Sequence, residues 1–206
     1  MSEFMSYDPW GKITTRNGIQ GDLVISALQK SIRRGLAEEA VTFAYEMYIT
    51  SEQFEDKLWR RLQAISVEDV GFGDLSAPVL INTLNQMRQN FPYADGDRTI
   101  FFVHAIRYLA AAKKDRTSDN LKNIVKTEFA YGRKPVIPDF AFDMHTEKGR
   151  EMGRDFKHFL AEGSKVKNEH PVDDNYKARL LALLDKIEQE QPEEIENAFV
   201  YNGWQA

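Results

Sequence analysis

The stretch RTIFFVHAIRYLAAA, residues 98–112, decides the fold class of this chain. Nearly all of its positions are apolar, so no side of a helix built from it would be distinctly polar. A helix that is apolar on all sides is usually surrounded by other helices rather than lying on a surface. We therefore expect residues 98–112 to form the central helix of a helical domain.

Shorter segments with apolar residues at three- and four-residue spacing flank this helix on both sides. They predict helices over residues 22–34, 36–49, 51–65, 76–87, 119–131, 146–162 and 174–189, with Asp22, Ser51, Asp119 and Thr146 as N-terminal caps. No stretch alternates with period two beside a hairpin turn for long enough to predict a sheet. The sequence thus predicts an all-α fold of about eight or nine helices.

The distribution of turn residues and charges predicts four regions. Residues 1–21 carry one proline and three glycines without a sustained period, which predicts an arm or linker. Residues 22–138 form the main helical domain, and residues 139–190 form a C-terminal helical extension of the same domain. Residues 191–206 form an acidic and aromatic tail.

Composition excludes several classes of chemistry. The chain has 206 residues, 42% of them hydrophobic, and no cysteine, so disulfides, thiol nucleophiles and cysteine metal sites are excluded. No run of 18 apolar residues occurs, and the first 20 residues lack the basic start and apolar stretch of a signal peptide. We expect a cytoplasmic protein with no membrane partner.

Charge is unevenly distributed along the chain. Residues 185–196 hold six acids and one base, whereas residues 107–134 hold eight bases and three acids. A basic segment of this kind can bind nucleic acid through its phosphates. The more common origin is a solvated face whose charges neighbour acids in the fold.

Glycine motifs for nucleotide binding are missing. Gly71, Gly73, Gly149 and Gly153 fit neither the phosphate-binding loop nor the dinucleotide fingerprint, and no Gly-x-Ser-x-Gly motif occurs. We expect no ATPase activity from this chain alone, no catalytic residue and no cofactor.

The segment from Asp143 to Phe159 carries the densest pattern of polar residues. Arg150, Arg154 and His158 recur at four-residue spacing, which predicts a basic ridge on the helix over residues 146–162. Gly149 and Gly153 each lower helix stability by about 1 kcal/mol relative to alanine, so they indicate a close approach by another backbone or a ligand. Either the arginines contact phosphate or they pair with neighbouring acids.

An enzyme is the alternative interpretation of the same segment. Asp143, His145 and His158 could hold a metal or act as acid and base on a phosphorylated substrate. The Asp-x-His spacing is short and common, so it has little specificity.

A second polar group is formed by Arg60, Arg61, Glu68 and Asp69. Acids and arginines that flank a helix end are more often structural ion pairs than catalytic dyads. We expect them to hold the following glycine turn against the helix.

Three stretches together resemble a known family: SALQKSIR at residues 26–33, RRLQAISVEDVG at residues 60–71 and YLAAAKK at residues 108–114. They are similar to the C-terminal region of the MgsA/RarA replication-associated recombination ATPases, which are AAA+ proteins related to clamp loaders. The sequence departs from the family at Gln29, where the family usually has histidine. No ATPase module precedes the matching region within these residues.

The resemblance implies a clamp-loader collar-like fold for residues 22–138 and assembly into a homotetramer. We therefore expect a non-enzymatic assembly module, related to DNA replication and recombination, that self-associates. A regulatory protein that binds the collar of an AAA+ ATPase partner is a further interpretation. Candidate contacts to DNA or to a partner are Lys30, Arg33, Arg34, Lys113, Lys114, Arg150, Arg154 and His158.

Overall fold

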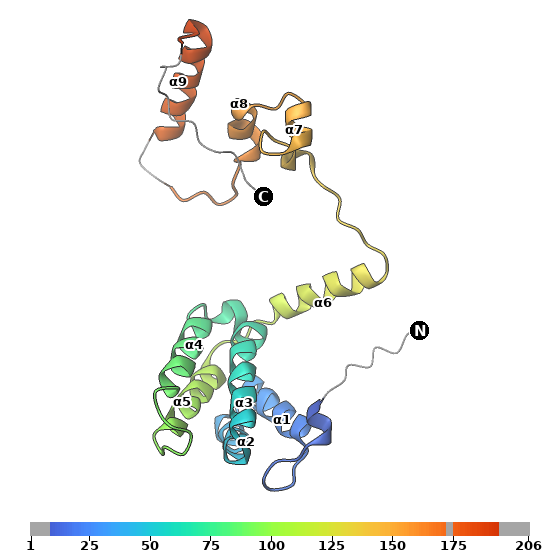
Figure 1. Cartoon of the computed structure of the whole chain (residues 1–206), viewed down its shortest axis with the longest axis vertical. Helices are drawn as coiled ribbons and strands as arrows, with labels where there is room; N and C mark the ends of the chain where they lie inside the picture. Colours follow the sequence, from blue (N-terminus) through green and yellow to red (C-terminus); the bar gives the residue numbers. More distant parts are fainter. Residues whose placement is uncertain (1–8, 172–174, 194–206) are drawn as a thin grey trace. The chain divides into compact units, whose positions relative to one another are not determined.

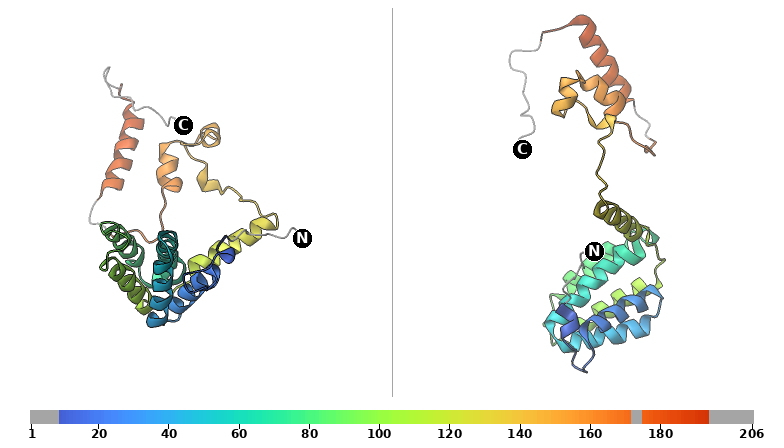
Figure 2. Two further views of the ribbon diagram at one scale, coloured as in Figure 1. Left: turned by 60° about the horizontal axis from the view of Figure 1, so that its bottom comes forward. Right: turned by 90° about the vertical axis from the view of Figure 1, so that its right-hand side faces the viewer.

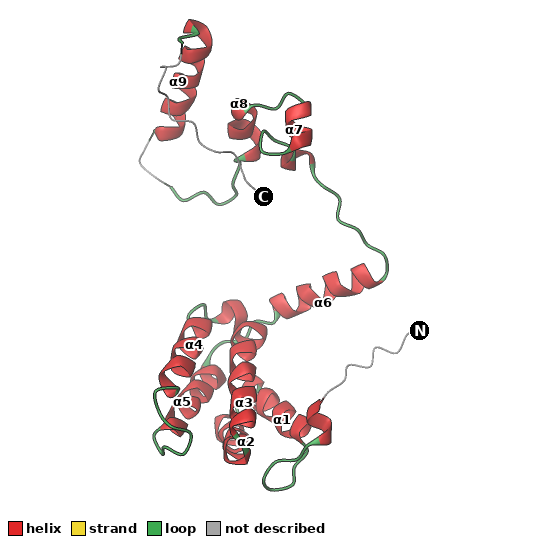
Figure 3. Ribbon diagram, viewed as in Figure 1, coloured by secondary structure: helices red, strands yellow, loops and turns green. Residues whose placement is uncertain are grey.

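The computed structural model of the chain describes residues 9–171 and 175–193 (Figure 1). Within these ranges the chain forms nine α-helices joined by short 3₁₀ and π-helical turns, and no strand (Figure 3). The prediction of an all-α fold is therefore confirmed. The predicted tail over residues 191–206 and the first part of the predicted arm lie mostly outside the described residues.

The chain divides into two compact units, residues 1–133 and residues 134–206. The N-terminal unit contains α1 (Gly21–Arg33), α2 (Ala37–Thr50), α3 (Glu52–Ile65), α4 (Ala77–Arg88), α5 (Arg98–Ala111) and α6 (Thr117–Ala130). The helices α1 to α5 pack side by side, whereas α6 leaves this body at its first turn (Figures 1 and 2). The C-terminal unit begins at residue 134.

Helix ends follow local sequence signals in part. Ser51 caps α3 as predicted, because its hydroxyl accepts a hydrogen bond from the Phe54 amide at 3.3 Å. Asp22 and Asp119 do not act as caps: α1 and α6 begin at Gly21 and Thr117, so both carboxylates lie in the first helical turn. Negative charge is favourable there because the helix dipole is positive at this end.

The core of the N-terminal unit is made by α1 to α5, and α5 contributes Phe102, Ala105, Ile106 and Leu109 to it. The opposite side of α5 is exposed, with Ile100 58% accessible to solvent and His104 exposed as well. The expectation that α5 is surrounded on all sides is therefore wrong. No helix covers its outer face in the described part of the unit, so one face alone is buried.

The described part of the predicted arm is docked on the body. Trp10 packs edge-on against Phe54 at 4.9 Å, and the amide of Asn17 donates to the Glu46 carboxylate at 3.0 Å. Burial opposes ionisation of Glu46, but hydrogen bonds from Thr15 and Asn17 outweigh it and hold the pKa of this carboxyl below 4.5. The segment from Pro9 onward thus belongs to the fold.

In its described residues, the C-terminal unit contains two short α-helices, a π-helical turn and one helix of 15 residues. They are α7 (Glu147–Glu151), α8 (Phe156–His158), a π-helical turn (Phe159–Gly163) and α9 (Tyr176–Glu190). Lys157 of α8 pairs with Asp185 of α9 at 2.8 Å. Across the described ranges, every helix is too short or too polar to cross a membrane.

The single helix predicted over residues 146–162 is broken. Thr146 caps α7 as predicted, accepting from the Gly149 amide at 3.0 Å. Gly153 then takes a left-handed conformation with φ of 72°, which ends the helix before α8 begins. Arg150, Arg154 and His158 therefore do not share one helical face, and the predicted basic ridge is not formed.

The two glycines of this segment have different roles. A Cβ atom at Gly149 would overlap the carbonyl group of Asp143, so another backbone approaches here as the sequence predicted. No atom lies within 4 Å of the corresponding position at Gly153, where the positive φ is the constraint.

We predict that Gly149→Ala disrupts the turn between residues 139 and 163 because the added methyl group has no space. Hydrogen exchange of peptides from this segment should become faster. Gly153→Asn is the matched control, since asparagine tolerates a left-handed conformation and the surrounding space is open. Unchanged protection in Gly149→Ala would contradict the close packing described here.

Candidate functional site

The π-helical turn Ser66–Val70 follows α3 and carries a fully buried carboxylate, that of Asp69. This carboxylate accepts hydrogen bonds from Arg33 Nε at 2.7 Å, from Gln29 Nε2 at 3.0 Å and from Arg116. Its backbone carbonyl also accepts from the Asp115 amide at 3.0 Å. Asp69 therefore ties α1, the turn after α3 and the segment before α6 to one another.

Two further acids complete what we call the Asp69 cluster, which consists of Gln29, Arg33, Arg61, Glu68, Asp69, Arg116 and Asp119. Glu68 accepts from Gln29 at 3.0 Å and lies 3.7 Å from Arg61. Asp119 in the first turn of α6 binds Arg116 and Lys122. The hydrogen bond from Lys122 and the charge of Arg116 hold the pKa of Asp119 below 3.8.

The predicted motif of Arg60, Arg61, Glu68 and Asp69 is only partly assembled. Arg61, Glu68 and Asp69 come together, whereas Arg60 is exposed on α3 and lines a separate cavity. Arg33, predicted as a contact for DNA or a partner, is directed at Asp69 instead. Arg116 was missed because it lies 47 residues from Asp69 in the chain.

An apolar surface lies beside the Asp69 cluster. A cavity of about 190 Å³ is lined by Ser66, Val67, Gly71, Phe72, Leu75, Pro78 and Ser118. Phe72, Leu75 and Val79 are about 70% exposed around it. We call Val67, Phe72, Leu75 and Val79 the turn patch. Because Ser118 belongs to α6, this cavity extends to the first turn of that helix.

Helix α6 carries a second exposed apolar group. Leu121, Ile124, Val125 and Phe129 recur at helical spacing, which places them along one stripe, and they are 40–61% exposed. Asp119 is the one buried residue of this helix. We call these four residues the α6 stripe. Contiguous apolar surface of this kind marks interaction sites in proteins.

Three of the predicted basic contacts are exposed where two helices end. Lys30 and Arg34 lie at the C-terminal end of α1, and Lys113 follows α5. These ends adjoin, because a Cβ atom at Gly35 would lie 3.5 Å from the Ala110 carbonyl oxygen. We call Lys30, Arg34 and Lys113 the basic end.

Lys114 is not part of this surface. Its ammonium group donates to the carbonyls of Leu109 and Ala110 at 2.8 and 3.0 Å and so caps the C-terminus of α5. Burial lowers the pKa of Lys114. The side chain therefore stabilises the helix end.

In the C-terminal unit, Arg154 and Arg150 both bond to nearby backbone. Arg154 donates to the carbonyls of Asp139 and Phe142, each at 2.7 Å, and Arg150 donates to the Met144 carbonyl at 3.1 Å. Arg154 thus holds the turn that precedes α7. Arg154 also pairs with the Asp139 carboxylate at 2.7 Å, whereas Arg150 bonds to a backbone carbonyl rather than to a neighbouring acid.

Asp143 and His145 come together, but they do not form a metal site with His158. The His145 ring lies 3.2 Å from the Asp143 carboxylate, and hydrogen bonds from the amide and ring of His145 lower the pKa of Asp143. His158 Nδ1 is buried without a hydrogen-bond partner. Among the described residues, no group of three or more histidine or acidic side chains is arranged to hold a metal ion.

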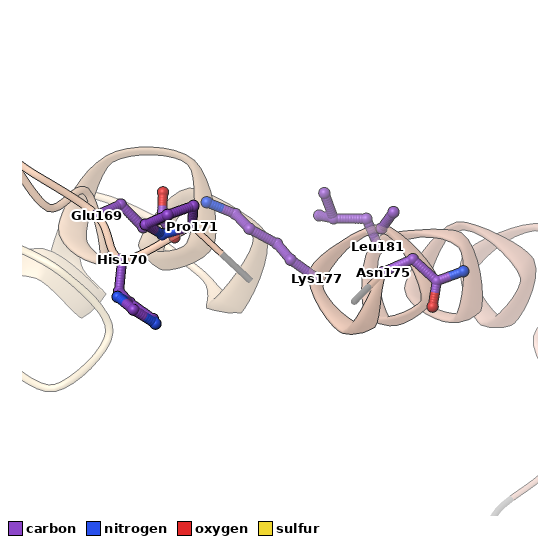
Figure 4. Close-up of a pocket in the computed structure, with 7 residues that line it drawn as sticks. Glu169, His170, Pro171, Asn175, Lys177 and Leu181 are labelled. Atoms are coloured by element: carbon purple, nitrogen blue, oxygen red, sulfur yellow. The ribbon is translucent and has the colours of Figure 1, made fainter. Parts of the chain in front are cut away.

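A cavity of about 660 Å³ lies between Pro171 and the start of α9 (Figure 4). Figure 4 shows Lys177 extending from α9 toward Glu169 and Pro171, with Leu181 further along the helix. The lining includes Glu169, His170 and Lys177, and all of its residues are exposed.

The comparisons with known proteins add no family. The chain matches no protein-family model, and a search of the curated proteins gives no match. The resemblance to the MgsA/RarA C-terminal region remains a prediction from the three sequence stretches.

Sequence reasoning also missed a second buried ion cluster. Glu55, which is 1% exposed, binds Arg98 at 2.9 and 3.0 Å and Arg88 at 3.1 Å. A signal was present, because Glu55 falls three residues before Leu58 on the buried face of α3. An acid on an apolar stripe indicates a buried ion pair.

We predict that Asp69→Asn lowers the free energy of unfolding by about 3–5 kcal/mol, because two arginines lose the carboxylate that balances their charge. Urea unfolding followed by circular dichroism measures this change. Glu38→Gln, an exposed acid of α2, is the matched control and should change stability by less than about 0.5 kcal/mol. Equal stability of the two variants would show that the Asp69 cluster is not required for the fold.

Proposed function

We propose that this chain is a non-enzymatic helical assembly module that self-associates through the α6 stripe and the turn patch. The observation that carries the proposal is the exposure of the α6 stripe on a helix that leaves the body of its unit (Figure 1). Removing such apolar side chains from water stabilises a complex by about 25 cal/mol per Å² before the cost of association. In a symmetric dimer, the same apolar surface of a second copy of the chain would pack against it.

The Asp69 cluster supports this role. It ties the first turn of α6 to the body, because Arg116 pairs with Asp69 of the turn after α3 and with Asp119 of α6. Preorganisation of this kind lowers the entropic cost of association. The resemblance to the MgsA/RarA family points to the same role, since it implies a collar that assembles as a tetramer in DNA replication and recombination.

The basic end supports the nucleic-acid part of the proposal. Lys30, Arg34 and Lys113 are exposed, and they lie outside the Asp69 cluster. Lysine and arginine groups bind phosphates and release counterions, so such binding weakens as salt rises. An AAA+ ATPase with a collar of similar build would be a partner for the α6 stripe.

We predict that Val125→Asp abolishes self-association, because a charge in the α6 stripe would have to lose its water in the interface. Light scattering after size exclusion at about 50 µM should give an assembly for the unmodified chain and a monomer for the variant. Asn123→Lys, which adds a charge beside Asp119 and is three or four residues from no member of the stripe, is the matched control and should still assemble. A monomeric unmodified chain at this concentration would refute the assembly role.

We predict that Lys30→Glu weakens binding to a DNA oligonucleotide by about tenfold at roughly 50 mM salt and flattens its salt dependence. Fluorescence anisotropy of a labelled strand measures both quantities. Lys186→Glu in α9 changes the net charge equally and should have little effect. Undetectable binding by the unmodified chain would remove DNA from the proposal and leave assembly untouched.

A further inference from the structure

A polar cavity of about 290 Å³ lies between α3 and α4, in the N-terminal unit, and the assembly role does not use it. Its lining consists almost entirely of side chains that can form hydrogen bonds. They are Asp56, Trp59, Arg60, Gln63, Asn85, Arg88 and Gln89. A cavity with this lining suits a small polar ligand or a single polar side chain.

One residue that lines the cavity carries a buried donor that has no hydrogen-bond partner. Trp59 is 1% exposed, and its indole Nε1 forms no hydrogen bond. A buried N–H group without an acceptor is unfavourable, and tryptophan usually finds one when it is buried. An acceptor atom bound in the cavity would satisfy this group.

Arg88 supplies further donors beside the indole. Its guanidinium lies 5.7 Å from the centre of the Trp59 ring and is held by Glu55, Asp56 and Asn85 at 3.1 Å each. These contacts occupy three of the five N–H groups of a guanidinium, so two can still donate. The fork geometry of arginine favours a carboxylate or phosphate acceptor.

The net charge of the side chains around the cavity favours a carboxylate over a phosphate as the acceptor. Arg88 and Arg98 pair with Glu55 and Asp56, and Arg60 lines the same cavity, so these five groups carry one positive charge in excess. No acid among the described residues pairs with Arg60, which is exposed on α3. A single negative charge balances this site, whereas a doubly charged phosphate would leave it negative.

We propose that the cavity between α3 and α4 binds a carboxylate group, with Trp59, Arg60 and Arg88 as donors. The carboxylate belongs either to a peptide side chain or to a small organic acid. Binding at this site is independent of self-association, since none of these residues belongs to the α6 stripe or the turn patch.

The test follows the indole N–H resonance of Trp59 by nuclear magnetic resonance, assigned through its loss in Trp59→Phe. Sodium acetate and the capped peptide acetyl-Gly-Glu-Gly-amide are added to the full chain, and sodium chloride and inorganic phosphate serve as comparison salts. We expect a saturable shift with acetate and only a weak, unsaturated shift with chloride and phosphate. A stronger response to the peptide identifies a peptide source, and a response to acetate alone identifies a small acid.

Two variants test whether acetate binds at this cavity rather than elsewhere on the protein. Arg60→Gln should weaken acetate binding by about fivefold, as expected for the loss of one charge-assisted hydrogen bond. Arg107→Gln, an exposed arginine of α5, should leave it unchanged. An unmoved indole resonance, an equal response to chloride or phosphate, or equal effects of the two variants would overturn the proposal.

Discussion

The buried carboxylate of Asp69 can keep its charge only where donors replace the water it has lost. Arg33 comes from α1, Arg116 from the segment before α6, and Gln29 from the same face of α1 as Arg33. Because the buried Asp69 carboxylate needs these donors, α1, the turn after α3 and the segment before α6 meet at this residue. The glycine turn after α3 and the direction of α6 both follow from it.

The surfaces that remain exposed follow from the same constraint. Because the first turn of α6 is held through polar contacts to Asp69 and Asp119, its apolar residues are left on the side that the body does not cover. The turn patch lies beside the glycines of the turn, which approach the backbone of Asp115 and Lys113 closely, while Phe72 and Leu75 stay about 70% exposed. The polar contacts of the Asp69 cluster therefore lie next to the exposed apolar side chains of the α6 stripe and the turn patch.

Local periodicity predicted most helices because three- and four-residue spacing reports the buried face directly. The helix prediction failed where a single glycine changed the backbone conformation. The contact prediction failed where two interacting residues are far apart in the sequence. Gly153, with φ of 72°, splits the helix expected over residues 146–162, and a glycine in a helical pattern does not reveal its φ. Arg116 meets Asp69 across 47 residues, a pairing that no spacing rule contains. Glu68 and Asp69 were therefore predicted as members of an ion-pair motif, whereas their contacts with Arg116, and the pairing of Arg116 with Asp119, were not.

The claim that the α6 stripe is a protein interface is tested most directly by hydrogen exchange of the α6 amides at two protein concentrations. If copies of the chain cover the stripe, exchange over residues 117–130 slows markedly at the higher concentration, while the buried helix α5 exchanges at the same rate in both samples. Exchange over residues 117–130 that is independent of concentration, up to about the millimolar range, would contradict the account.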